Sequence, residues 1–314
     1  MGMRRAGGCC ATAGDESSQK PRDPTAPHGK QFSWVSPETL HSNSQFAGAH
    51  CSCRVVERTK QSYKCAMLRF FVHAIIVLGL TALTQIGGIA WLVAIFFRHR
   101  AIAFIVFYAA LTVASILVAP TFGRVPLNCF DTGKLQVQSW MYCALNRHYV
   151  APDIADILVD TAQEMDKRFP GAVTVVLDAN FPFLDGFPLL PHLSHDDGDK
   201  VDLAFFYQSS SGYLPAATRS PIGYFAFEQG PSDCSKHRPT LRWDFGLLQP
   251  LWRDYALDLP RNSAVLEILS GDERVGKIFV EPHLVQTLNA AHPKIRFQGC
   301  RAARHDDHIH FQLK

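Results

Sequence analysis

Two long uncharged stretches constrain this chain more than any other feature. Residues 70–97 contain no Asp, Glu, Lys or Arg, and residues 101–123 contain none either. Only the basic segment Arg98-His99-Arg100 separates them. A helix needs roughly 20 predominantly apolar residues to cross a bilayer, and both stretches reach that length. We therefore predict a two-helix transmembrane hairpin over residues 67–123. Two buried helices in the core of a soluble protein are the alternative.

Residues 1–66 have a different composition. They are rich in Ser, Gly, Pro, Thr and Lys and show no sustained apolar period, which is typical of disordered segments. A cleavable signal peptide is not indicated, because the apolar stretch after them is too long and starts too late. Met67 stands directly before the first predicted span. If translation starts there, residues 1–66 are an extension that is never made, a hypothesis that N-terminal sequencing of the native protein tests.

The orientation of the hairpin depends on the Lys and Arg residues near its ends, which favour the cytoplasmic side. If the tail is translated, the cations before the first span outnumber Arg98 and Arg100 in the turn, which places the domain after the spans in the cytoplasm. These cations are Arg54, Arg58, Lys60, Lys64 and Arg69. With a start at Met67 only Arg69 remains, so the turn is cytoplasmic. We expect this second arrangement, with the domain in the periplasm and its anchor in the inner (cytoplasmic) membrane.

The rest of the chain, residues 124–314, reads as one α+β domain. Asp153 can cap a helix that Pro170-Gly171 ends, and apolar residues recur through it at helical spacing. Strands are expected over residues 173–179 and 200–207, and residues 276–283 are expected to form a strand and then a turn into a short helix. The last strand covers residues 308–313. The net charge of +3 is small, so nothing in the charge balance predicts nucleic acid binding.

Four cysteines lie well apart in this domain, and no two of them have the CxxC spacing of a structural zinc site. They are Cys129, Cys143, Cys234 and Cys300. Two disulfides in an oxidising compartment explain this pattern, and four unrelated buried thiols explain it equally well. The sequence leaves the pairing open.

Histidines and carboxylates gather in two segments of the domain. On the strand over residues 308–313, His308 and His310 point to the same side, because side chains alternate between the faces of a strand. His195 precedes Asp202 by seven residues, and Gly198 allows a turn between them. Two imidazoles and a carboxylate would leave a fourth metal position open for water, as in catalytic zinc sites. A further imidazole beside the metal can accept a proton from that water.

Together, the motifs SHxxGxxxD at residues 194–202 and HxxHxH at residues 305–310 resemble the LAS group of zinc peptidases, and within it the penicillin-insensitive murein endopeptidase family. The resemblance implies a metallopeptidase domain whose antiparallel sheet carries the zinc site. It implies Zn²⁺ ligation by His195, Asp202 and His310, with His308 as the catalytic histidine and His305 as a further active-site histidine. The family has no membrane spans, and it usually has Ala where this chain has Lys200.

Some neighbouring residues invite other assignments. Asp307 has the spacing of a catalytic carboxylate found in related D,D-peptidases, but we favour His308. Arg147 and Arg304 are candidates to bind substrate carboxylates, because Arg forms bidentate ion pairs with them; ordinary surface arginines are the alternative. His192 lies on the ligand loop but off the motif, which favours a structural role.

The sequence therefore predicts a membrane-anchored zinc metallopeptidase that hydrolyses peptide cross-links of peptidoglycan. One alternative is a non-catalytic zinc-containing module that binds cell-wall peptides or a membrane partner. A third reading, from the literal charge count, is a cytoplasmic amidase or dipeptidase.

Overall fold

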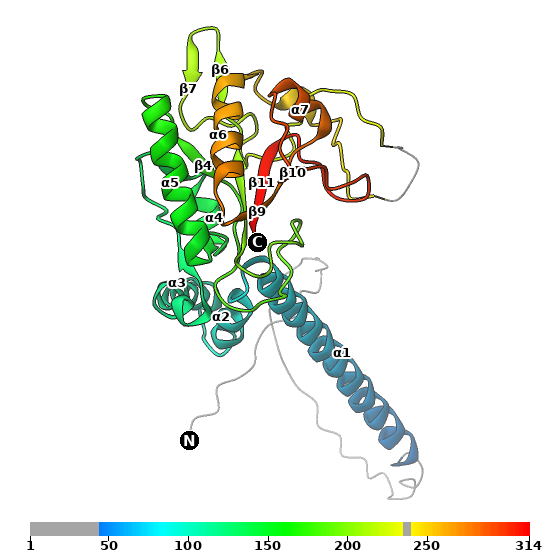
Figure 1. The fold of residues 1–314 in the computed structure, drawn as a ribbon. Helices are drawn as coiled ribbons and strands as arrows, with labels where there is room; N and C mark the ends of the chain where they lie inside the picture. The colour runs from blue at the N-terminus through cyan, green and yellow to red at the C-terminus, as the bar shows by residue number, and fades with distance from the viewer. Residues whose placement is uncertain (1–43, 235–239) are drawn as a thin grey trace, which may run out of the picture. The chain divides into compact units, whose positions relative to one another are not determined.

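The structure is a computed structural model that describes residues 44–234 and 240–314, with side chains from residue 63 onward (Figure 1). The chain divides into two units, residues 1–61 and 62–314, of which the second holds both candidate spans and the domain after them. Residues 1–43 of the predicted disordered tail lie outside the described residues. Residues 44–66 form the first part of helix α1 (Ser44–Thr84).

The apolar region at the start of the second unit forms three helices and a short 3-10 helix. After α1 come α2 (Gly87–Ala94), α3 (Arg100–Val118) and η1 (Ala119–Phe122). Two segments are long and apolar enough to cross a membrane, Tyr63–Thr84 and Arg100–Phe122. The second matches the predicted span. The first begins earlier than predicted. It also ends earlier, because the helix breaks at Gln85, which has a φ of 65°.

Two glycines explain how α2 can pack closely on α1 after this break. A Cβ atom on Gly88 would lie 2.0 Å from the hydroxyl of Thr81 and 2.8 Å from the carbonyl of Val77. A Cβ atom on Gly87 would lie 2.6 Å from the hydroxyl of Thr84. Only glycine permits this approach of two helices, as is common where helices pack within a membrane.

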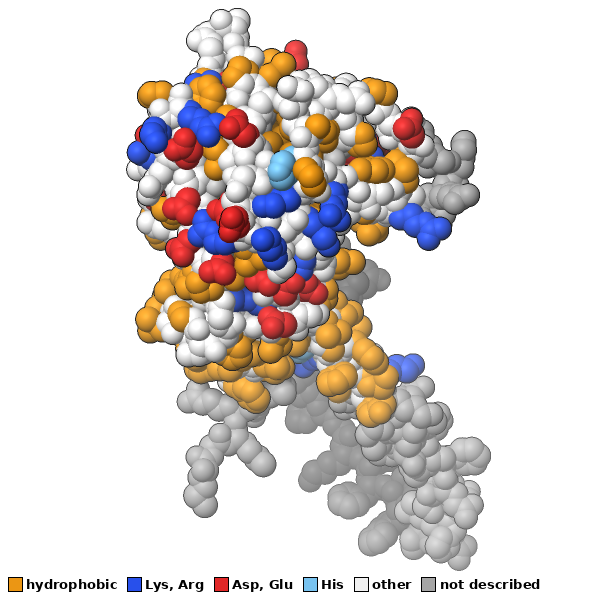
Figure 2. Space-filling view, viewed as in Figure 1, with side chains coloured by type: hydrophobic (Ala, Val, Ile, Leu, Met, Phe, Trp, Pro, Cys, Tyr) orange, Lys and Arg blue, Asp and Glu red, His pale blue; other side chains and the backbone are white. Residues whose placement is uncertain are grey.

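Hydrophobic side chains gather on the coloured part of the helical region, whereas charged side chains are spread over the domain after it (Figure 2). On α1 and α3, large apolar residues are mostly solvent-exposed, among them Leu68, Ile75, Leu78, Ile105 and Leu117. An apolar surface of this extent is rare on soluble monomers and marks a surface that contacts lipid or another protein. The exposed faces therefore favour the membrane hairpin over buried core helices.

A six-stranded sheet forms the centre of the domain, in the order β10-β9-β11-β5-β4-β2. Its strands are β2 (Leu135–Val137), β4 (Thr174–Val176), β5 (Lys200–Ala204), β9 (Val275–Phe279), β10 (Ile295–Arg296) and β11 (His308–Leu313). The four central strands are antiparallel, as predicted. At the edges, β10 runs parallel to β9 and β2 parallel to β4, so the sheet is mixed and the prediction of an antiparallel sheet is wrong there.

Helices α5 (Pro152–Arg168) and α6 (Leu259–Gly271) cover one face of this sheet (Figure 1). Val201 and Leu203 of β5 and Ile309 and Phe311 of β11 belong to the same buried core as these helices. Because strand side chains alternate, the residues between them, including Asp202, lie on the opposite face. This face is free to hold a polar site.

The start of α5 differs slightly from the prediction. Ala151 is the N-cap and Pro152 the first helical residue, while Asp153 lies in the first turn. Proline is favoured at that position because its fixed φ suits the helix and its missing N–H is not needed there. The predicted apolar positions Ile154 and Met165 are buried as expected.

Shorter elements complete the domain. They are β1 (Val125–Pro126), α4 (Trp140–Ala144), β3 (Tyr149–Val150), β6 (Tyr207–Ser209), β7 (Gly212–Leu214), η2 (Gln249–Leu251), β8 (Ala256–Leu257) and α7 (Pro282–Thr287). β1 pairs with β3, and β6 lies between β7 and β8 in a three-stranded sheet. The single strand predicted over residues 200–207 is therefore divided between two sheets.

Two disulfides join the four cysteines of the domain, which confirms the disulfide prediction. Cys129 pairs with Cys143 and Cys234 with Cys300, at Cα–Cα distances of 6.2 and 5.2 Å. The second closes the longer loop, with a sequence separation of 66 against 14. Their presence favours an oxidising compartment.

Removal of the Cys234–Cys300 disulfide by double alanine substitution is expected to lower the free energy of unfolding by about 2–4 kcal/mol, since the unfolded chain regains the freedom of a long loop. The Cys129–Cys143 double variant is the matched control, with a loss smaller by about 1 kcal/mol. Denaturant unfolding of the purified chain measures both. A larger loss for the control would contradict the loop-length explanation.

Candidate metal centre

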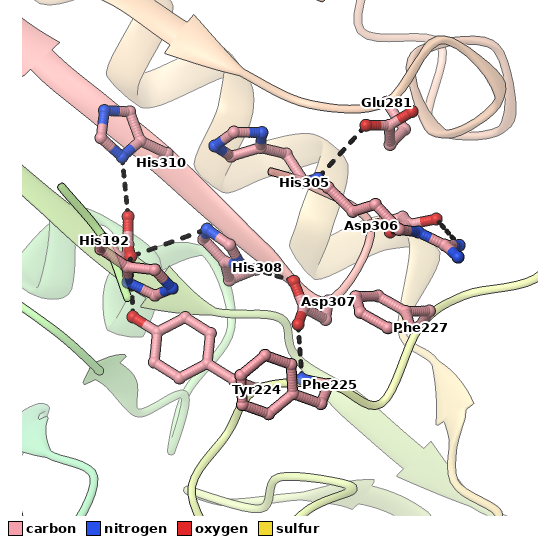
Figure 3. A network of polar contacts seen from close by, with 12 residues as sticks. His192, Tyr224, Phe225, Phe227, Glu281, His305, Asp306, Asp307, His308 and His310 are labelled. Carbon is pink, nitrogen blue, oxygen red and sulfur yellow. Dashed lines mark hydrogen bonds and ion pairs between the residues drawn. The ribbon is translucent and has the colours of Figure 1, made fainter. Parts of the chain in front are cut away.

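The polar face of the sheet brings the two predicted motifs together. His310 of β11 pairs with Asp202 of β5 in the strand register, and His308 pairs with Ala204. His308 and His310 lie on the same side of β11, as predicted, and both are buried (Figure 3). His195 reaches the same place from the loop before β5. The sequence separation of His310 and Asp202 is 108 residues, so only the fold creates this cluster.

Three donor atoms of the predicted ligands converge. Nδ1 of His310 lies 2.8 Å from Oδ1 of Asp202. Nε2 of His195 lies 3.2 Å from each of these two atoms. In a tetrahedral site with metal–nitrogen bonds of about 2.0 Å, ligand atoms are about 3.3 Å apart. The three atoms therefore have nearly the separation that a tetrahedral metal ion requires.

The hydrogen bond of His195 and the lowered pKa of His310 both favour metal binding. Nδ1 of His195 donates to the carbonyl of Ala179 at 2.8 Å, which leaves the lone pair of Nε2 directed at the cluster, as in most metal-binding histidines. Burial lowers the pKa of His310 to about 4, so this ring is neutral at ordinary pH. Nε2 of His310 is buried without a hydrogen-bond partner among the described residues.

His192 also belongs to the cluster, although its place off the motif favoured a structural role. With His195 and Asp202 it forms a buried group whose donor atoms lie within 4.8 Å of one another and could hold a metal ion. Its Nδ1 lies 3.0 Å from Oδ2 of Asp202 and 3.3 Å from Oδ2 of Asp178. Burial opposes a charge on His192, but the two neighbouring carboxylates outweigh burial and raise its pKa to about 10.

These contacts are compatible with two roles for His192 at the site. It is either a third imidazole ligand or a cation that bridges two carboxylates. The spacing His192-x-x-His195 is the signal in the sequence that could have drawn attention to it.

Tyr224 is a site residue that the sequence did not reveal, because it lies in a loop far from either motif. Its hydroxyl donates to Oδ2 of Asp202 at 2.7 Å and accepts from the backbone N–H of Asp178 at 3.0 Å. Burial raises the pKa of Tyr224 well above its usual value, so the phenol remains a donor. With Oδ2 engaged in this way, Oδ1 of Asp202 is the oxygen that remains for a metal.

His308 stands beside the donor atoms with a carboxylate behind it. Its Nε2 lies 3.6 Å from Oδ2 of Asp202, and its Nδ1 lies 2.5 Å from Oδ1 of Asp307. The backbone N–H of Phe225 donates to the other oxygen of Asp307 at 2.6 Å. Burial disfavours the charged ring, but the charges of Asp202 and Asp307 outweigh it and raise the pKa of His308. Asp307 thus orients His308 (Figure 3).

His305 completes the row of imidazoles. Its ring centroid lies 5.0 Å from that of His308 and 5.6 Å from that of His310. Burial, and then the neighbouring imidazoles, lower its pKa well below the usual value. Its backbone N–H donates to Glu281 at 3.3 Å, and Arg242 holds that carboxylate with two hydrogen bonds of 3.0 and 2.9 Å. This ion pair fixes the chain as it enters β11.

Arg147, a candidate to bind substrate carboxylates, has its donors engaged within the protein. It is buried, and its guanidinium donates to both oxygens of Asp178 at 2.6 and 2.5 Å and to the carbonyl of Leu190 at 2.8 Å. Its donors thus face protein acceptors rather than a cavity. Arg147 holds Asp178, which in turn contacts His192, so its place is behind the cluster.

Substitution of Arg147 by Lys is therefore expected to lower the free energy of unfolding by about 1–3 kcal/mol, because an ammonium cannot make the paired bonds to Asp178 and leaves buried acceptors unsatisfied. Thermal unfolding measures this loss, and the exposed Arg301, changed to Lys, is the matched control. If the variant kept full stability but needed much more substrate for half-maximal rate, the result would support the substrate-binding prediction instead.

Arg304, in contrast to Arg147, lies at the edge of cavities. It holds Asp306 through two hydrogen bonds, one of 2.9 Å, and lies 4.0 Å from the ring centroid of Phe227. Burial raises the pKa of Asp306 to about 6 despite this pairing. Arg304 also lines two cavities. The prediction that it contacts substrate stays open.

Three cavities form a row that begins at the metal cluster. The first, about 190 Å³, is lined by His195, Asp202 and the three histidines of the last motif. A small one of about 50 Å³ shares His192 and Leu241 with it. The third, about 760 Å³, shares Trp243 and Arg304 with the second. An extended ligand could therefore lie across the cluster and continue along an aromatic wall.

Comparison with known proteins adds no family assignment. No protein-family model matches the chain, and no curated protein matches it. Any function must therefore be argued from the residues of the cluster.

Proposed function

We propose that this protein is a membrane-anchored zinc metallopeptidase that hydrolyses peptide cross-links of peptidoglycan in the periplasm. One observation carries the proposal: the donor atoms of His195, Asp202 and His310 converge at 2.8–3.2 Å. Nitrogen and oxygen donors in this arrangement suit Zn²⁺. The resemblance of both motifs to the LAS zinc peptidases supports the substrate class.

Zinc bound by these three residues would polarise a peptide carbonyl and acidify a water molecule. His308 accepts the proton of the attacking water through Nε2, the nitrogen that is not engaged by Asp307. The charged imidazole is then stabilised by the carboxylates of Asp202 and Asp307, and it can give the proton to the leaving amine. His305, kept neutral by burial, lies beside His308 and lines the cavity where the substrate carbonyl would lie.

The disulfides support the periplasmic side of the membrane, and the basic turn supports it if translation starts at Met67. Two disulfides are stable in the periplasm but not in the reducing cytoplasm, which supports the outward orientation over a cytoplasmic amidase or dipeptidase. Fusions of alkaline phosphatase and of a cytoplasm-only fluorescent reporter after Lys314 test this. Phosphatase activity supports the periplasmic side, and fluorescence from the second fusion would contradict it.

The activity is tested with the full chain in detergent, incubated with cross-linked muropeptide dimers, with and without a chelator. We expect monomers to be released, release to stop with the chelator, and zinc to restore it. The exposed His292, changed to Ala, is the control variant and should keep full activity. A chain that binds zinc but cleaves no dimer would instead favour the non-catalytic zinc-containing module. A chain that binds no zinc would contradict both.

A further inference from the structure

The loop over residues 181–199 supplies part of the metal cluster but has little regular structure of its own. It carries His192 and His195, and no helix or ladder strand falls within it among the described residues. Ordering such a loop costs conformational entropy. Contacts from outside the loop must offset that cost before its histidines can be held for metal binding.

Arg124 holds both ends of this loop. It follows the second candidate span almost directly, and its side chain is 1% exposed. Its guanidinium donates to the carbonyl of Phe181 at 2.8 Å and to the carbonyl of Asp196 at 3.3 Å, and it pairs with Asp185. At the far end, a Cβ atom on Gly198 would lie 3.0 Å from Nε of Arg124. The loop therefore closes around this one side chain.

Two residues of the helical hairpin hold the first residues of the loop, at Phe183. Gln85, at the break between α1 and α2, is 6% exposed, and its side-chain oxygen accepts from the backbone N–H of Phe183 at 3.0 Å. Phe122, the last residue of η1, packs edge-on against the ring of Phe183 at a centroid distance of 5.2 Å. The positive φ of Gln85 is an uncommon conformation for this residue type, and it places this side chain at the loop.

We infer that the hairpin α1–α3 positions the metal-ligand loop and so raises the affinity of the site for its metal, beyond anchoring the domain to the membrane. Gln85 and Phe122 act as positioning residues. They touch neither a ligand side chain nor a substrate cavity; they act through Phe183. The inference rests on the proposed zinc site.

The test compares Gln85→Ala and Phe122→Ala with the wild type, as full chains in lipid nanodiscs. Zn²⁺ affinity is measured by competition with a chelating dye, and the coordination geometry by the visible absorption of Co²⁺ bound in place of zinc. We expect each variant to bind zinc about 10–100-fold more weakly, the range found when supports of metal ligands are removed, with an altered Co²⁺ spectrum. Phe122→Tyr, which keeps the aromatic ring, is expected to keep the wild-type zinc affinity and the wild-type Co²⁺ spectrum.

Leu117→Ala is the matched control, because Leu117 lies on α3 with 76% of its surface exposed and should leave affinity and spectrum unchanged. If either alanine variant failed to fold, Asp185→Asn, which weakens the exposed partner of Arg124, is expected to lower affinity in the same direction. Folded variants with wild-type affinity and spectrum would overturn this inference alone. A wild type that binds neither metal would overturn the zinc site itself, and the inference with it.

Discussion

His310→Ala is expected to remove zinc and to reduce peptide hydrolysis at least about 10³-fold, whereas His192→Ala is expected to retain zinc. Nδ1 of His310 is 2.8 Å from Oδ1 of Asp202, the oxygen that Tyr224 leaves open. The metal contributes several kcal/mol to transition-state stabilisation, and about 4 kcal/mol corresponds to that factor. Zinc content by mass spectrometry and the rate on muropeptide dimers measure both variants.

The comparison of the two variants decides which imidazole is the third ligand. If His192 bridges Asp178 and Asp202, it supports the ligand Asp202 without binding the metal itself. Its loss should then weaken zinc binding only about 10–100-fold. The reverse outcome, zinc lost with His192→Ala and kept with His310→Ala, would assign the metal to the group His192–His195–Asp202. Asp156→Ala, a change on α5, controls for the effect of purification on metal content.

His308→Ala is expected to keep zinc and lower kcat about 10²–10⁴-fold, the usual contribution of a positioned acid–base group. His308 lies beside the converging donor atoms of His195, Asp202 and His310 but supplies none of them. Kinetics at saturating substrate, with zinc content measured on the same samples, separate the loss of a proton acceptor from the loss of metal.

Asp307→Asn provides the companion measurement. Because Asp307 contacts Nδ1 of His308, its amide variant should reduce the rate less than His308→Ala does, by weakening the orientation and charge of the ring. A larger loss for Asp307→Asn than for His308→Ala would show that Asp307 is the catalytic carboxylate, as its spacing in the motif first allowed.

The sequence predicted the local features of the site well. Alternation along a strand correctly placed His308 and His310 on one face, and Gly198 forms the expected turn with a φ of 91°. These features depend on a few neighbouring residues. Helix α5 and the central strands were likewise readable from periodicity, whereas the number of cysteines allowed two disulfides without deciding for them or for their pairing.

Partners that are distant along the chain could not be predicted. Arg147 appeared free to bind substrate because nothing in the sequence places Asp178 opposite it, and Tyr224 gives no sign that it will reach Asp202. The break at Gln85 was missed for a related reason. An uncharged stretch long enough for one span gives no signal of where a helix stops, and here the glycines at positions 87 and 88 allow the chain to fold back.

The position of β11 between β5 and β9 links metal binding to the folding of the domain. The chain must close a segment of 108 residues before His310 meets Asp202, and such distant pairings form late and slowly. An ion that binds only the closed state adds to native stability by mass action, about 4 kcal/mol at a free concentration roughly 1,000 times its dissociation constant. Under the proposed zinc ligation, a scarcity of zinc would therefore reduce the amount of folded protein as well as its activity.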